Sequence, residues 1–189
     1  MVNTDSFFYS LKQSGVDLFT GVPDSLLKNI CAFITDNTSP ENHIIAANEG
    51  NAISIGIGYH LATKKTPLIY LQNSGLGNII NPLLSLVDPD VYSIPMILLI
   101  GWRGEPGFAD EPQHIKQGRI TTDLLDVMKI PYEILSSESS SEESDQIVKR
   151  MVKQASTLNA PCALLVKKGT FSSYKLKLDN YYKRDLYRE

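Results

Sequence analysis

Glu49 is the residue of this chain that is best placed to do chemistry. It follows a short apolar segment, residues 43–47, that is typical of a buried strand, and it precedes a small and apolar run, residues 53–62, that is typical of a buried helix. We therefore expect Glu49 to be half-buried at a strand-to-helix junction. The alternative is an ordinary acid in the first turn of a helix, where the helix dipole stabilises negative charge.

Three other segments combine polar side chains with turn-forming glycine or proline. Each follows an apolar run that is predicted to be a strand, and they are residues 21–25, 72–78 and 101–104. In an open parallel sheet, ligands bind beyond the carboxyl ends of the strands. Together with the Glu49 segment, these loops therefore indicate one site.

The loop that follows the fourth predicted strand is dense in ionisable groups. It begins near Arg103 and reaches His114. One interpretation is a charged surface excursion, and the other is a functional loop, because it leaves the most apolar strand of the chain. His43 and His60 lie on predicted core elements, so we expect them to be structural.

The order of the elements predicts an α/β fold with a doubly wound, six-stranded parallel sheet and helices on both faces. Strand and helix patterns alternate, and the strands are continuously apolar, as in parallel sheets that are covered on both sides. The expected strands are residues 16–20, 43–47, 67–72, 95–100, 132–135 and 162–166. We expect a loop at 73–78, then a helix that begins at Pro82 or near Gly77 with a bend at Pro82. A short helix at 121–128 should follow the long loop.

Composition narrows the classes of protein. The chain has 189 residues with a net charge of -3, which gives no general reason to expect nucleic-acid binding. No apolar run approaches the length of a membrane span, and no signal peptide is evident, so we expect a cytoplasmic protein without a membrane partner. Cys31 and Cys162 lie in apolar runs and are expected to be reduced core residues. Residues 1–169 form the predicted domain, and residues 170–189 a linker or docking tail.

Known site motifs are mostly missing. The Gly75-Leu76-Gly77 segment could cradle a phosphate, but it lacks the third glycine of a dinucleotide fingerprint and follows the wrong strand. The histidines lie far from the cysteines and from one another, so no metal site is expected in this chain. A plain phosphate-binding domain is therefore an alternative with little support.

Taken together, the ordered motifs resemble those of the phosphonopyruvate and sulfopyruvate decarboxylases, a branch of the thiamine-diphosphate enzymes. The resemblance extends over about residues 5–169, and its motifs are GVPDS at 21–25, ANEGNA at 47–52, QNSGLGN at 72–78, GWRG at 101–104 and DEPQH at 110–114. Leu76 stands where most thiamine-diphosphate enzymes have proline. The segment is similar to the pyrimidine-binding domain of the family.

The resemblance also implies a second half. The family binds the diphosphate through Mg²⁺ on another domain, with a Gly-Asp-Gly motif that this sequence lacks. We therefore expect thiamine diphosphate as cofactor, Mg²⁺ ligands on a diphosphate-binding domain or subunit, a small 2-oxo acid as substrate, and at least a dimer in the working enzyme. Gly56 and Gly58 would help a neighbouring copy to pack closely, or would serve helix-to-sheet packing within the chain.

The resemblance assigns roles to individual residues. Glu49 shares a proton with a ring nitrogen of the aminopyrimidine, and Asp24 and His114 match the acid and the histidine that handle protons on the reaction intermediate. Arg103 could pair with a phosphonate or sulfonate, or only with Glu105 or Asp110. Further cofactor contacts are expected from Pro23, Asn73, Gly75 and Gly77, and further substrate contacts from Ser25, Asn73 and Ser74.

The implied reaction is decarboxylation of 3-phosphonopyruvate to phosphonoacetaldehyde, a step of phosphonate biosynthesis. The sequence leaves two alternatives open. One is the alpha subunit of a sulfopyruvate decarboxylase, and the other is a binding or regulatory module that keeps the fold without catalysis.

Overall fold

Six parallel strands form a single sheet in the computed structural model, which describes residues 1–177. Their order across the sheet is β2-β1-β3-β4-β6-β5. The strands are β1 (Phe19–Gly21), β2 (His43–Ile45), β3 (Leu68–Gln72), β4 (Met96–Gly101), β5 (Tyr132–Leu135) and β6 (Pro161–Val166). The chain reverses its direction of travel across the sheet after β2, so β1 and β3 are neighbours and a topological switch point lies between them.

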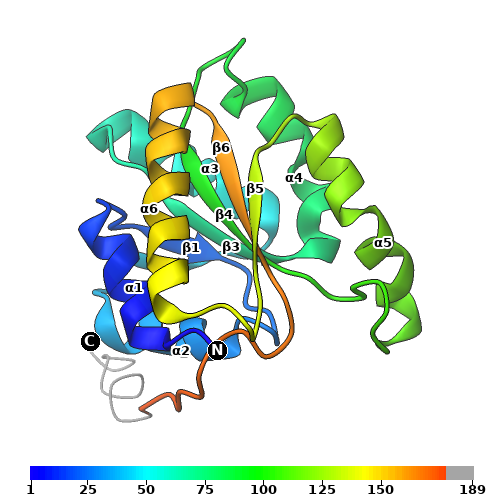
Figure 1. Cartoon of the computed structure of the whole chain (residues 1–189). Helices are drawn as coiled ribbons and strands as arrows, with labels where there is room; N and C mark the ends of the chain where they lie inside the picture. The colour runs from blue at the N-terminus through cyan, green and yellow to red at the C-terminus, as the bar shows by residue number, and fades with distance from the viewer. Residues whose placement is uncertain (178–189) are drawn as a thin grey trace, which may run out of the picture.

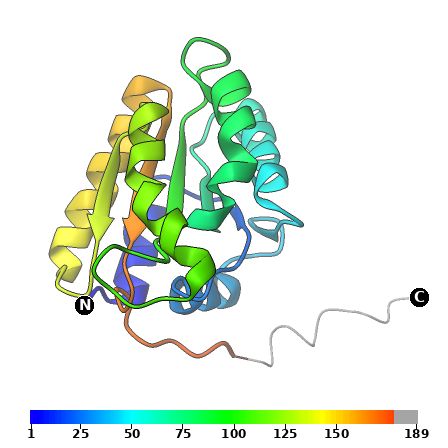
Figure 2. The ribbon, with the colours of Figure 1, turned by 90° about the vertical axis from the view of Figure 1, so that its right-hand side faces the viewer.

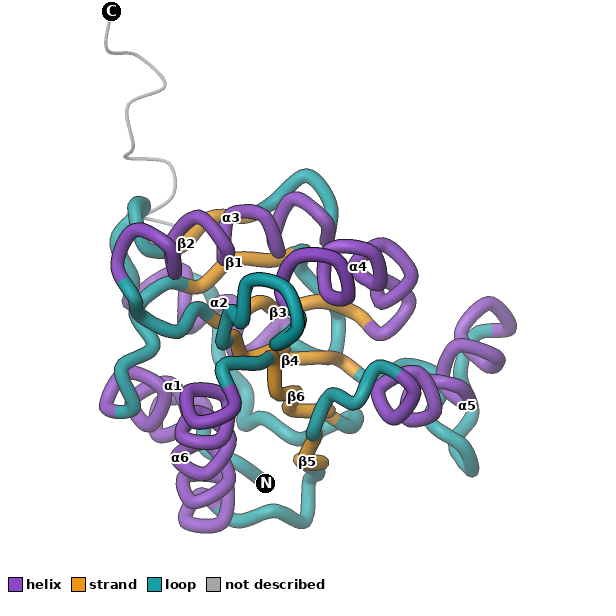
Figure 3. Tube along the Cα trace, turned by 90° about the horizontal axis from the view of Figure 1, so that it is seen from above, coloured by secondary structure: helices purple, strands orange, loops and turns teal. Residues whose placement is uncertain are grey.

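Helices cover both faces of this sheet, which confirms the predicted doubly wound α/β class (Figures 1 and 2). Seen from above, the sheet runs between two helical layers (Figure 3). One layer contains α1 (Thr4–Gln13), α2 (Lys28–Asn37) and α6 (Ser141–Leu158), and the other contains α3 (Glu49–Thr63), α4 (Leu76–Pro82) and α5 (Pro112–Val127).

The central strands separate two apolar cores. Every residue of β4 is buried, and its side chains alternate in direction because successive residues of a strand point to opposite faces. Ile97 and Leu99 belong to the core under α1, α2 and α6. Leu98 and Ile100 belong to the core under α3, α4 and α5. This two-sided burial explains why the strand is continuously apolar in sequence.

The strand before Glu49 differs from the sequence expectation. We predicted a buried strand, but β2 lies at the edge of the sheet and pairs only with β1 among the strands described. Its side chains are partly exposed, and Ile45 is 50% exposed. Apolar content alone does not distinguish an edge strand from a central one, so the prediction of burial was wrong here.

The strand expected at residues 16–20 is found three residues shorter at its start, as Phe19–Gly21, and two further corrections concern where helices begin. We predicted that residues 73–78 form a loop. Instead, Asn73–Gly75 form a 3-10 turn, and α4 begins directly after it at Leu76. The alternative of a helix that starts near Gly77 is therefore confirmed, and after Pro82 the chain continues as a π-helical turn at Leu83–Val87. The predicted bend at Pro82 stays a prediction. Similarly, α5 begins at Pro112 rather than near residue 121, so His114 lies in its first turn and not in a loop.

The segment after β6 packs against the domain. Val2 and Phe171 form an isolated β-bridge, and the ring of Phe171 contacts Phe7. The Tyr174 hydroxyl donates to Asp36 on α2 at 3.0 Å. The boundary predicted at residue 169 stays a prediction, and the rest of the predicted tail, residues 178–189, lies outside the described residues. Within residues 1–177, no helix is long and apolar enough to cross a membrane.

Candidate active site

The predicted site residues gather at the carboxyl ends of the strands, as the parallel topology requires; we call this the carboxyl edge of the sheet. β1, β3 and β4 all end at this edge, since Gly21 is opposite Tyr70 and Gln72 is opposite Gly101. The loops that follow these strands carry Asp24, Asn73 and Arg103. Glu49, which opens α3 after β2, lies at the same edge.

Glu49 is half-buried and fixed on two sides. Asn48 caps α3 by accepting a hydrogen bond from the Asn51 amide at 2.9 Å, so Glu49 is the first helical residue. Asn78 on α4 donates from Nδ2 to Glu49 Oε2 at 2.7 Å. A Cβ on Gly75 would lie only 2.5 Å from Glu49 Oε1, so the carboxylate rests directly on this glycine. Among residues 1–177, Oε1 has no hydrogen-bond partner and is free to bond a ligand.

Asn78 is a site residue that the sequence analysis missed. It was grouped with a glycine-rich turn and given no role. Its position in the first turn of α4, facing the first turn of α3, depends on packing between two helices that are separated in sequence by β3. An amide side chain that directly follows the Gly75-Leu76-Gly77 segment is the signal that was available.

Asp24 is a buried carboxyl group at the end of β1. Its Oδ2 accepts from the amides of Leu26 at 2.7 Å and Leu27 at 3.2 Å, whereas its buried Oδ1 has no partner among the described residues. Burial raises the pKa of Asp24 above the ordinary value, and the two amides partly oppose this effect. A Cβ on Gly101 would lie 2.3 Å from Oδ2, so this glycine makes room for the carboxyl.

Arg103 pairs with Asp110 across its own loop. The guanidinium donates from Nε at 2.8 Å and also forms a salt bridge through Nη2, while Asp110 accepts from the Gly104 amide at 2.7 Å. The guanidinium holds the pKa of Asp110 well below its ordinary value. Arg103 Nη1 donates to Ser25 Oγ at 3.0 Å, and this bond joins the loops after β1 and β4.

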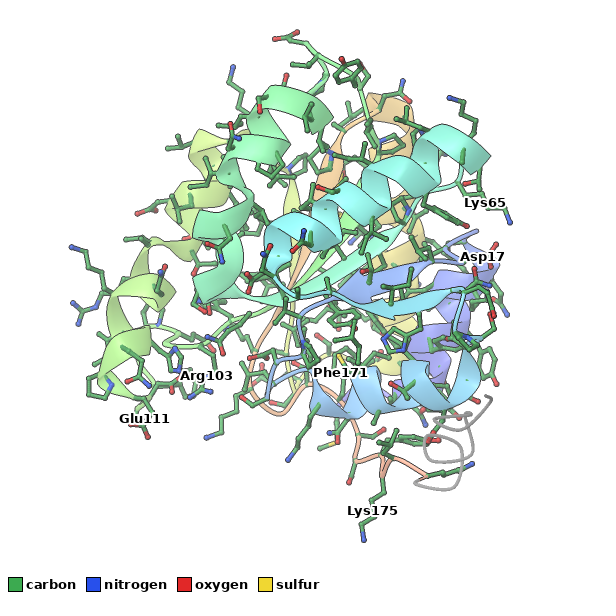
Figure 4. All side chains as sticks on the ribbon, turned by 180° about the vertical axis from the view of Figure 1, so that it is seen from behind. Asp17, Lys65, Arg103, Glu111, Phe171 and Lys175 are labelled. Carbon is green, nitrogen blue, oxygen red and sulfur yellow. The ribbon has the colours of Figure 1, made fainter. Side chains whose placement is uncertain are left out.

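A cleft of about 420 Å³ lies beside Arg103, between the segments that follow β1, β4 and β6. We call it the Arg103 cleft. Arg103 and Phe171, both of which line it, are labelled in Figure 4. Ser25 and Trp102 also line the cleft, but Glu49, Asp24 and His114 do not.

Asn73 is fully buried and joins three parts of the site. Its Oδ1 accepts from the Arg103 amide at 3.1 Å, and its Nδ2 donates to the Arg103 carbonyl at 2.8 Å and to Thr121 Oγ1 at 2.9 Å. These bonds fix the loop after β4 to β3 and to α5. The predicted contacts of Asn73 with cofactor and substrate stay predictions.

His114 is positioned by close packing of α5 on the loop after β4. A Cβ on Gly104 would lie 1.9 Å from the His114 carbonyl oxygen, and a Cβ on Gly118 would lie 1.7 Å from the Gly104 carbonyl oxygen. Trp102 Nε1 donates to the Gly118 carbonyl at 2.9 Å. The His114 Nδ1 is buried and unpartnered among the described residues. No described contact joins His114 to Asp24, so their joint role stays a prediction.

Four of the remaining predicted residues lie on the protein surface, in the segments that follow β1 and β3. Pro23, Ser25, Ser74 and Gly77 are exposed. A Cβ on Gly77 would meet nothing within 4 Å, unlike one on Gly75. Gly56 packs against the sheet, where a Cβ would lie 2.7 Å from Ile69 Cδ1, whereas Gly58 faces open space. Gly56 therefore serves helix-to-sheet packing.

Comparison of the sequence with known protein families identifies the family to which the chain belongs. The family model of the thiamine pyrophosphate enzyme, N-terminal TPP binding domain, matches residues 1–127. The chain belongs to this family. Thiamine diphosphate is the family's cofactor, and the matched region contains Asp24, Glu49, Gly75, Arg103 and His114.

Two kinds of relative share sequence with this chain. It is 32% identical to the sulfopyruvate decarboxylase subunit alpha of Methanococcus maripaludis over 163 residues, which cover 86% of this chain and 93% of that subunit. It is 36% identical to the phosphonopyruvate decarboxylase of Streptomyces viridochromogenes over 135 residues, which cover 71% of this chain and 33% of that enzyme. The chain thus spans about a third of the length of the latter.

Solved structures agree on the fold. The thiamine diphosphate-dependent 4-hydroxybenzoylformate decarboxylase of Rhodococcus jostii RHA1 superposes with a TM-score of 0.60 at 18% identity, covering 98% of this chain and 34% of that chain. The 2-oxoglutarate:ferredoxin oxidoreductase of Magnetococcus marinus gives a TM-score of 0.56 at 16% identity, covering 90% of this chain and 29% of that one.

The residues at the Glu49 junction fit the aminopyrimidine part of the cofactor. A ring nitrogen needs a carboxyl group that can share a proton, and Glu49 Oε1 is available for it. The missing side chain of Gly75 leaves the carboxylate in close contact with the turn after β3. Within residues 1–177, no group of three or more His, Cys, Asp or Glu side chains is arranged to hold a metal ion.

Proposed function

We propose that this chain is the pyrimidine-binding half of a thiamine-diphosphate-dependent decarboxylase that converts 3-phosphonopyruvate to phosphonoacetaldehyde and carbon dioxide. The observation that carries the proposal is Glu49, which opens α3 and is fixed between Gly75 and Asn78. The names of the relatives support a 2-oxo acid with a second anionic group as substrate. A diphosphate-binding domain or subunit completes the site, and Mg²⁺ binds there.

Decarboxylation needs an electron sink and a proton. When bound, thiamine diphosphate supplies the electron sink that accepts the bonding pair as the C1–C2 bond of the 2-oxo acid breaks. Glu49 holds a proton between Oε1 and a ring nitrogen of the aminopyrimidine. Asn78 keeps Oε2 occupied, so it leaves one carboxylate oxygen for this task.

The carbon that loses carbon dioxide must take up one proton before aldehyde is released. Asp24 and His114 are proposed to deliver it. A buried carboxyl with a raised pKa is protonated over a wider pH range than an exposed one, so Asp24 is suited to act as an acid. The buried Nδ1 of His114 would find its hydrogen-bond partner in the complete site.

A sulfopyruvate decarboxylase alpha subunit is the second candidate. The similarity to such subunits extends over 86% of this chain, compared with 71% for the phosphonopyruvate decarboxylase. The chemistry at C1 and C2 is the same in both cases, and only the anion at C3 differs.

The test is carbon dioxide release from 3-phosphonopyruvate and 3-sulfopyruvate by the assembly of this chain with its diphosphate-binding half, thiamine diphosphate and Mg²⁺. We expect turnover that depends on the cofactor and prefers 3-phosphonopyruvate. Preference for 3-sulfopyruvate would select the second candidate. No turnover of either substrate by a folded assembly that binds the cofactor would reject both and favour a non-catalytic module.

A further inference from the structure

The Arg103 cleft contains more positive charge than its carboxylates neutralise. Its lining has three cationic side chains, Lys28, Arg103 and Lys168, and two carboxylates, Glu105 and Asp110. Lys28 comes from the first turn of α2, and Lys168 follows β6. The cleft volume of about 420 Å³ is in the range of small-molecule sites.

Both carboxylates already have cationic partners. Asp110 is bound by Arg103, and Glu105 forms a 2.5 Å salt bridge with Lys167. The Arg103–Asp110 pair is largely shielded, with side chains 20% and 16% exposed. A substrate anion could recruit Arg103 only in competition with a carboxylate that is already in place, so the guanidinium offers little net charge to it.

Lys28 and Lys168 are in the opposite situation. Within residues 1–177, no ion pair involves either side chain, and both residues are exposed at the cleft. They approach it from different elements, one on the β1 side and one on the β6 side. Lysine carries a compact charge on a flexible stem, so two lysines can close on an oxyanion from two sides.

We propose that Lys28 and Lys168 bind the anionic group at C3 of the substrate, and that Arg103 holds the wall of the cleft instead of binding that group. The identity of the ligand as a phosphonate or sulfonate rests on the proposed function, whereas the anion site rests on the cleft itself. Arg103 is then a positioning residue, which links Asp110 to Ser25.

Trp102 makes the anion site measurable without turnover. It is the only tryptophan of the chain and lines the cleft. We would titrate the full chain with 3-phosphonopropionate, which has the phosphonate and the carboxylate of 3-phosphonopyruvate but lacks its reactive 2-oxo group, and follow Trp102 fluorescence. Lys28→Met and Lys168→Met should each raise the dissociation constant about ten-fold, and Lys28→Arg should restore binding. Higher salt should weaken binding to the native chain.

Lys153→Met is the matched control, because Lys153 is an exposed lysine on α6 outside the cleft. It should titrate like the native chain. Thermal unfolding should be unchanged in all the lysine variants, since both cleft lysines are exposed. Native affinity in Lys28→Met and in Lys168→Met would overturn the proposal.

Activity of the complete assembly separates this proposal from the proposed function. In both lysine variants, kcat/KM for 3-phosphonopyruvate should fall about ten-fold through KM, and kcat/KM for pyruvate, which lacks the second anion, should not fall. An equal loss for both substrates would overturn the specificity role. Lysine-dependent binding of the probe in an assembly that decarboxylates neither substrate would support the anion site and reject the decarboxylase function.

Discussion

Two regions at the carboxyl ends of the strands fix their functional groups in different ways. At the α3–α4 junction, Glu49 is fixed by one amide and by contact with a glycine, and one carboxylate oxygen stays available. At the loop after β4, Arg103 and Asp110 bind each other, Asp110 also accepts from the Gly104 amide, and Arg103 also donates to Ser25. The first arrangement leaves a hydrogen-bond acceptor available for a ligand. In the second, the charged groups bind each other and form part of the lining of the Arg103 cleft. A charged residue at a site is therefore not by itself a ligand-binding residue.

Replacing Glu49 tests the available carboxylate and should give the largest effect. Glu49→Gln keeps the size of the side chain but cannot share a proton in the same way, so we expect kcat of the assembly to fall about 10³-fold. Steady-state carbon dioxide release measures this, and thermal unfolding should be close to native. Near-native turnover would remove Glu49 from the mechanism.

Asp24→Asn tests a carboxyl group that, unlike Glu49, is buried and bound by backbone amides. The amide oxygen can still accept from Leu26 and Leu27, but proton delivery is lost, so turnover should fall about 10²-fold. A kcat within two-fold of native would contradict the proposed proton transfer.

The pH dependence of stability provides a second measurement on Asp24→Asn. Because burial raises the pKa of Asp24, its favourable contribution to folding is present below the ordinary pKa of an aspartate and is lost as the pH rises through the raised value. The native chain should therefore lose thermal stability relative to Asp24→Asn over that interval, and the variant should melt higher at neutral pH. A constant difference in melting temperature across pH would show that the carboxyl does not titrate as described.

Gly75→Ala disturbs the Glu49 junction without changing a charge. Its Cβ would lie 2.5 Å from Glu49 Oε1, so the carboxylate must move, and displacement of a catalytic group by about 1 Å can cost about 10²-fold in rate. Gly58→Ala is the matched control, because Gly58 lies on α3 outside the predicted cofactor contacts and its Cβ would meet nothing within 4 Å. Equal activity in the two variants would show that the contact with Gly75 does not position Glu49.

Asn78→Ala should have the smallest effect of the four. The backbone of Glu49 is unchanged, but Oε2 loses its donor and the carboxylate can rotate, so we expect about a ten-fold loss of kcat/KM. Asn78→Ser, which keeps a shorter donor, should recover part of it. A loss in thermal stability without a loss in kcat/KM would assign Asn78 a structural role only.

Much of the fold could be predicted from sequence, because parallel strands that are buried on both faces appear as continuous apolar runs. β5 was predicted with its observed bounds, and Glu49 was placed at the strand-to-helix junction where α3 begins, because the sequence changes there from an apolar strand to small helix residues. The start of α5 was missed, because Glu111, Pro112 and Gln113 are typical of a loop, and the helix there is stabilised by close packing of Gly118 on Gly104.

The site was predictable at the level of loops but not of contacts. Position at the strand ends follows from topology, so Glu49, Asp24 and Arg103 could be grouped before any coordinates were known. The partners of these residues depend on side-chain directions across separate elements. Hence Asn78 was overlooked, and the choice of Asp110 over Glu105 as the partner of Arg103 could not be made.

Binding of the aminopyrimidine at Glu49 can be observed in a structure of the complete assembly with thiamine diphosphate. We expect a ring nitrogen within about 2.6–3.2 Å of Glu49 Oε1, with Asn78 still bound to Oε2. A cofactor ring bound elsewhere, with Glu49 contacting only Asn78, would contradict it.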